Sequence, residues 1–101
     1  MALKLARVTD RTDGTCYHPS HLVPLKTGGS IITGSADTKD ENLLVARLDD
    51  TVQADCGHYG KIVSASSNTR INGRFAARLT DQVDGDYKAT IITASGKTDI
   101  N

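Results

Sequence analysis

The chain repeats the motif Ala-Arg-x-x-Asp three times, at residues 6–10, 46–50 and 77–81. A second motif, two branched apolar residues followed by Thr or Ser, then Gly or Ala, then Ser, also occurs three times, at 31–35, 62–66 and 91–95. A threonine follows three residues after the last serine of each copy, at Thr38, Thr69 and Thr98. We call these the Ala-Arg motif and the Ser motif. Three copies of two linked motifs predict three repeated structural units.

The repeated units have the composition of β-structure. Their apolar stretches are short, rich in Ile, Val and Thr, and bounded by Gly, Asn, Asp and Ser, a pattern typical of strands. Residues 38–47 and 69–78 have Thr, a basic residue and Ala-Arg at matching places. Their central dipeptides, Glu41-Asn42 and Asn72-Gly73, predict tight hairpin turns. We therefore expect an all-β fold, a compact cone of three β-hairpin repeats with approximate three-fold symmetry.

The third unit is incomplete at its carboxyl end. Residues 98–101 align with 69–72, but no return strand follows them. The N-terminal segment 3–8 has the pattern of that missing strand. We expect this strand to close the ring with the C-terminal segment 89–101, which would make residues 1–101 a single domain without an exposed sheet edge.

Composition narrows the classes of partner. Twelve basic and twelve acidic residues give a net charge of zero, which argues against binding to nucleic acid. The longest apolar run, residues 43–46, is too short to cross a bilayer, and charges near the N-terminus argue against a secretory signal. With 38% hydrophobic residues and four aromatic ones, the core is thin, so we expect a metal or a partner to add stability.

All the cysteines and histidines fall in two inserted segments that we expect to be loops: Cys16, His18 and His21 in the first, and Cys56 and His58 in the second. Thiolate and imidazole groups from two segments favour a tetrahedral zinc site. A Cys16–Cys56 disulfide is the alternative, disfavoured by the lack of an export signal, and solvated loop histidines are another.

Five candidate ligands compete for four positions, and two sets stay open. One set is His18, His21, Cys56 and His58; the other keeps Cys16 and omits either His18 or His21. Both give a closed coordination shell, which indicates a structural site.

Two other groups of polar residues are candidates for a function. Asp13 and Asp55 adjoin the candidate ligands, but a zinc hydrolase also needs an open metal position and a general base, so we expect no enzyme. The repeated arginines and aspartates are expected to form the same strand-end salt bridge in each unit; these are Arg7, Arg47, Arg78, Asp10, Asp50 and Asp81.

Taken together, the three Ala-Arg motifs, the stretch IVSASSNTRINGRFAARLTD and the loop ADCGHYG resemble the PAAR-repeat proteins over almost the whole chain. The sequence is most similar to the small members found at the tip of T-even-type phage baseplates. The resemblance implies a cone of short β-hairpins whose apex is pinned by one zinc ion, with iron as the alternative metal. The ligand set it implies is His18, His21, Cys56 and His58, with Cys16 outside that count.

The resemblance also implies a function. PAAR-repeat proteins cap the trimeric β-helical spikes of contractile phage tails and type VI secretion systems. We therefore expect one copy of this chain per spike trimer, a location in the virion at the tail baseplate, and transient contact with the outer membrane that the spike pierces. A type VI spike tip is the alternative; its members often carry extensions, so the short chain favours the phage.

Overall fold

The computed structural model describes residues 3–100, and these residues form strands, turns and bends without a helix. The prediction of an all-β fold is confirmed. No helix long and apolar enough to cross a membrane is found among the described residues. Three residues of the expected domain, Met1, Ala2 and Asn101, lie outside the described part of the chain.

Six strands form a closed antiparallel barrel, in the order β10, β11, β2, β3, β6, β7. It consists of three hairpins, each inserted between an Ala-Arg motif and the next Ser motif. The longest hairpin joins β2 to β3, with Arg11 opposite Ser30 and Cys16 opposite Leu25. Closure leaves these strands no free edge. Their bounds are β2 Arg11–Cys16, β3 Leu25–Ile31, β6 Thr51–Ala54, β7 Tyr59–Ile62, β10 Gln82–Gly85 and β11 Tyr87–Ile91.

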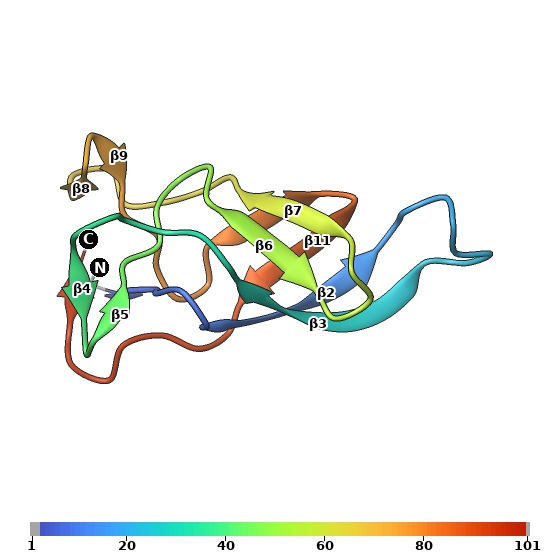
Figure 1. Ribbon diagram of the computed structural model, residues 1–101, viewed down its shortest axis with the longest axis horizontal. Helices are drawn as coiled ribbons and strands as arrows, with labels where there is room; N and C mark the ends of the chain where they lie inside the picture. The colour runs from blue at the N-terminus through green and yellow to red at the C-terminus, as the bar shows by residue number, and fades with distance from the viewer. Residues whose placement is uncertain (1–2, 101) are drawn as a thin grey trace.

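Three two-stranded sheets follow the Ser motifs. In Figure 1 the sheets β4–β5 and β8–β9 lie at one end of the molecule, whereas the loop between β2 and β3 projects from the other end. The molecule measures 40 × 27 × 22 Å along its principal axes. The paired strands are β4 Lys39–Asp40 with β5 Leu43–Leu44, β8 Arg70–Ile71 with β9 Arg74–Phe75, and β1 Leu3–Lys4 with β12 Asp99–Ile100.

The two complete hairpins turn at the predicted dipeptides. Glu41 and Asn42 have φ angles of 52° and 67°, and Asn72 and Gly73 have φ angles of 52° and 81°. Two successive positive φ angles define the mirror-image turn that matches the twist of a hairpin. The turn predictions are therefore confirmed.

Strand β1 pairs with β12, so that Leu3 lies opposite Ile100 and Lys4 opposite Asp99. The amide of Leu5 also donates to the carbonyl of Thr98 at 2.9 Å, and the amide of Ser95 donates to that of Leu5 at 2.8 Å. The N-terminal segment thus meets residues 95–100 of the expected closing segment. Ile91, at the start of the expected closing segment, pairs with Thr12 of β2. The reason is that β11 already has β10 and β2 as neighbours in the closed barrel, so it offers no edge to β1.

Three alanines lie at the centre of the molecule, one from each Ala-Arg motif. The amide of Ala6 donates to the carbonyl of Ala77 at 2.9 Å, that of Ala46 to Ala6 at 3.0 Å, and that of Ala77 to Ala46 at 3.0 Å. All three side chains are fully buried. Only a small side chain fits where three backbones approach one another this closely, which accounts for alanine at this place in each copy.

Apolar residues pack on both sides of this alanine ring. The barrel side holds Ile31, Ile62 and Ile91, one from each Ser motif, and the opposite side holds Leu5, Val45 and Ala76. The core thus consists of a larger cluster that includes the alanine ring and a smaller cluster beside it.

The repeated arginine and aspartate residues form one contact three times. Nε of Arg7, Arg47 and Arg78 lies 2.9, 3.1 and 3.0 Å from the aspartate three residues later. The intervening Thr9, Asp49 and Thr80 all have positive φ angles. The predicted strand-end salt bridge is confirmed in each copy.

Candidate metal centre

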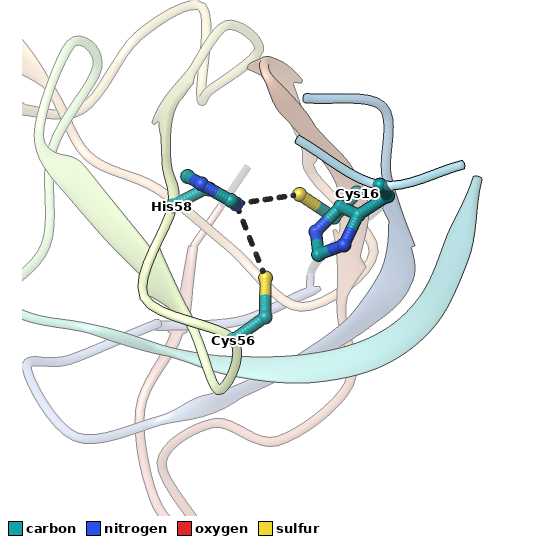
Figure 2. A group of neighbouring side chains, drawn as sticks. Cys16, Cys56 and His58 are labelled. Atoms are coloured by element: carbon teal, nitrogen blue, oxygen red, sulfur yellow. Dashed lines mark hydrogen bonds between the residues drawn. The ribbon is translucent and has the colours of Figure 1, made fainter. Parts of the chain in front are cut away.

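Cys56 and His58 lie in the tight turn between β6 and β7. The amide of Ala54 donates to the carbonyl of His58 at 2.8 Å, and the amide of Gly57 donates to the carbonyl of Ala54 at 2.8 Å. Gly57 has a φ angle of +99°, in the region that favours glycine. This turn brings the thiol of Cys56 beside the ring of His58 (Figure 2).

Cys16 reaches the same place from the barrel. It is the last residue of β2, opposite Tyr87 of β11, and its side chain is fully buried. The expectation that Cys16 lies in a loop is therefore wrong, because the insertion that contains it continues the barrel. After Cys16 the chain leaves the sheet and rejoins it at Leu25, the first residue of β3. Within this loop the amide of His21 donates to the carbonyl of His18 at 3.1 Å.

Four potential ligand atoms come together here, one each from Cys16, His21, Cys56 and His58, all within 4.8 Å of one another. Sγ of Cys16 lies 3.2 Å and Sγ of Cys56 lies 3.6 Å from Nδ1 of His58 (Figure 2). Around a tetrahedral zinc ion, sulfur and nitrogen ligands are about 3.5 Å apart. The Cys₂His₂ group is thus compact enough to bind one metal ion.

A buried ring nitrogen of His21 supports a metal site at this place. Its Nε2 atom is buried and has no hydrogen-bond partner among the described residues. A buried polar nitrogen without a partner is energetically costly. A metal ion at the centre of the group would remove that cost, so the residues present fit a bound cation.

The surroundings of Cys16 and His58 favour the uncharged form of these two side chains. Burial raises the pKa of the Cys16 thiol, and the neighbouring Cys56 raises it further. Partial burial and the nearby rings of His18 and His21 lower the pKa of His58. A neutral imidazole is ready to bind a metal, whereas the Cys16 thiol must lose its proton, so metal binding here releases protons.

His18 lies beside the group without joining it. Its ring stacks on that of His58, with centroids 3.8 Å apart and planes within 7° of parallel. Its Nδ1 atom is engaged by Ser20, through the hydroxyl at 2.9 Å and the amide at 3.0 Å. Of the two ligand sets that the sequence left open, the structure brings together the one that contains Cys16 and omits His18.

The other candidates serve structural contacts. Asp55 is held by Arg11 through bonds of 3.1 and 2.7 Å, while Asp13 is an exposed residue of β2. The two cysteines are free thiols and not a disulfide. Tyr87 is fully buried in the barrel, and its hydroxyl lies 2.8 Å from that of Thr12.

The repeat itself contains a signal for Cys16 that the ligand count had missed. Cys16 and Cys56 each stand six residues after the aspartate of an Ala-Arg motif, at Asp10 and Asp50. Equivalent positions lie at similar distances around a three-fold axis, so side chains that face inward from them, as the buried Cys16 and Tyr87 do, lie close together. The third equivalent position is Tyr87, which explains why the third insertion supplies no ligand.

Comparison with known proteins identifies no relative: no protein-family model matches the sequence, and no curated protein is significantly similar to it.

Proposed function

We propose that this chain is the structural tip of a contractile injection spike. It caps a trimeric β-helical spike protein, one copy per trimer, and presents a narrow apex to the bacterial outer membrane. The observation that carries the proposal is the ring of hydrogen bonds that joins Ala6, Ala46 and Ala77. It gives one chain three similar sides, which match a three-fold symmetric partner.

The placement of the two ends supports this function. The small hairpins β4–β5 and β8–β9 lie at one end of the molecule, and the β2–β3 loop projects from the other (Figure 1). Only the barrel is closed, so the expectation of a domain without open sheet edges does not hold for the small hairpins, each of which is two strands wide. Their open backbone edges are available for pairing with spike strands. The spike then covers the hairpin end and leaves the metal centre free.

The metal has a structural role in this proposal, and zinc is the ion it assigns. Four protein ligands fill a tetrahedral shell, and a shell without an open position suits stability better than catalysis. The ion links the β6–β7 turn to the β2–β3 loop, where the chain has few side chains to form a core. We place the assembled protein in the virion, at the tip of the tail baseplate.

The test is the mass of a mixture with a trimeric β-helical spike fragment, measured by light scattering. One copy of this chain per trimer is expected. Reversing exposed charges on two hairpins, Lys39→Glu with Arg70→Glu, should weaken binding without loss of metal. Lys26→Glu, a charge reversal at the opposite end, is the matched control and should bind normally. Binding of three copies per trimer, or weakening by Lys26→Glu alone, would refute the capping model.

A further inference from the structure

The β2–β3 loop carries the most exposed apolar side chains of the described chain. Leu22 is 104% exposed and Val23 is 72% exposed, with Tyr17 and Leu25 about half exposed nearby. We define the apex patch as Tyr17, Leu22, Val23 and Leu25. A fully exposed leucine beside a largely exposed valine gains little from the fold, and such a patch marks a binding surface.

The apex patch is free of charge. Residues 17–25 contain no Asp, Glu, Lys or Arg, although a quarter of the chain is charged. The first charged residue after them is Lys26, which is exposed and has no ion pair with any described residue. An apolar tip with a free cation behind it matches the layering of a bilayer, where acyl chains lie below anionic phosphates.

The backbone of the loop suits the same surroundings. Both prolines of the chain, Pro19 and Pro24, lie within it. Proline has no N–H group, so two fewer donors must lose their water when the loop enters an apolar phase. By contrast, the half-exposed Val63 on the barrel wall shares its surroundings with Lys61 and Asp84, which oppose insertion there.

The geometry points to a lipid-binding function for the apex patch: the loop inserts into the headgroup and acyl boundary of a membrane without applied force. This inference rests on the proposed function, because a metal on His21 would fix the residue next to Leu22. A loop held in one shape loses less entropy on binding than a free one. The tip therefore binds lipid before contraction of the injection apparatus pushes the spike forward. The first contact between tip and membrane is then a reversible binding equilibrium.

The absence of tryptophan from the chain permits a direct test with single-tryptophan reporters. Leu22→Trp reports on the apex patch, and Val63→Trp reports on the barrel wall. With metal-loaded protein and vesicles of phosphatidylethanolamine and phosphatidylglycerol, the emission of Leu22→Trp should shift to shorter wavelength and become protected from an aqueous quencher. Val63→Trp should show neither change.

Adding Val23→Asp to the Leu22→Trp protein should weaken partitioning at least about tenfold, while circular dichroism stays the same because Val23 is exposed. Lys26→Gln should lower the affinity for anionic vesicles but not for phosphatidylcholine vesicles. An unchanged Leu22→Trp spectrum would overturn the inference and would leave a protein ligand as the occupant of the apex patch. Equal shifts at both reporter positions would also overturn it. Binding to the spike trimer is measured in a separate experiment. A failure of lipid binding can therefore be distinguished from a failure of spike capping.

Discussion

The sulfur of Cys16 lies 3.2 Å from Nδ1 of His58, which joins the end of a barrel strand to a turn of the neighbouring hairpin. Cys16 is therefore as central to the group as Cys56, and replacement of either by Ser should have a similar effect. Each variant should lose bound metal, and its melting temperature should fall by on the order of 10 °C. Metal analysis and thermal unfolding of the purified proteins test this.

His18→Ala is the matched control for that experiment. Its ring stacks on His58 and its Nδ1 atom is engaged by Ser20, so it should keep the metal and lose only a few degrees of thermal stability. A chelator should lower the melting temperature of the unaltered protein and of His18→Ala, but not that of the cysteine variants. Metal loss in His18→Ala with retention in Cys16→Ser would contradict the ligand set.

Leu5 should be essential for the stability of the hairpin end. Its side chain is buried with Val45 and Ala76, and its amide donates to the carbonyl of Thr98 at 2.9 Å. Leu5→Ala should cost about 2–5 kcal/mol of unfolding free energy. The same substitution at the fully exposed Leu22 should cost almost nothing. Chemical denaturation of the two variants measures the contrast, and equal costs would show that β1 is only loosely attached.

The salt bridge of the Ala-Arg motif should matter because it is buried. Asp81 accepts hydrogen bonds from the amide of Arg78 at 2.7 Å, from its guanidinium at 3.0 Å, and from the hydroxyl of Ser64 at 3.0 Å. Asp81→Ala leaves these donors without their acceptor and should cost about 3–5 kcal/mol. Asp84→Ala removes an exposed partner of Lys88 and should leave the free energy of unfolding almost unchanged, because solvent screens such a pair. Urea unfolding of the two variants measures the difference. A smaller loss of stability for Asp81→Ala than for Asp84→Ala would contradict a stabilising role of the buried salt bridge.

Glu41 should make the contact between repeats sensitive to acid. Hydrogen bonds from the Gly96 amide and the Ser95 hydroxyl, with the charge of Arg7, hold the pKa of Glu41 below its usual range. Its stabilising effect is therefore present above the usual glutamate pKa of about 4.3 and is lost as the pH falls through the lowered value. The melting temperatures of the protein and of Glu41→Gln should differ at neutral pH and converge in acid. A constant difference down to about pH 2 would disprove the linkage.

The motifs that repeat could be interpreted from the sequence because each one encodes a local contact. The turn at Asn72-Gly73 follows from residues that tolerate positive φ angles, and the Arg78–Asp81 pair joins residues three positions apart. Local rules suffice for such features.

The barrel could not be predicted in the same way. Its strands include Gly14 and Gly29, which weaken a strand signal. The structure shows why they are there: a Cβ atom on Gly14 would lie 2.0 Å from the carbonyl oxygen of Lys88. Glycine is required by the close approach of a distant strand, and a single sequence does not identify that strand. The metal ligands could not be chosen from the sequence for the same reason. Whether Cys16 or His18 joins the group depends on which side chains the fold brings together.

The alanine ring has a consequence for how the protein sits on its proposed partner. A cap with three similar sides has three rotational settings on a symmetric trimer, related by turns of one third. If the three settings were equal in energy, their multiplicity would add about 0.65 kcal/mol to the binding free energy. The β2–β3 loop belongs to only one side, so it would point in a different direction from particle to particle. Averaging such particles with imposed three-fold symmetry would blur the loop and the metal centre while the hairpin end stayed sharp.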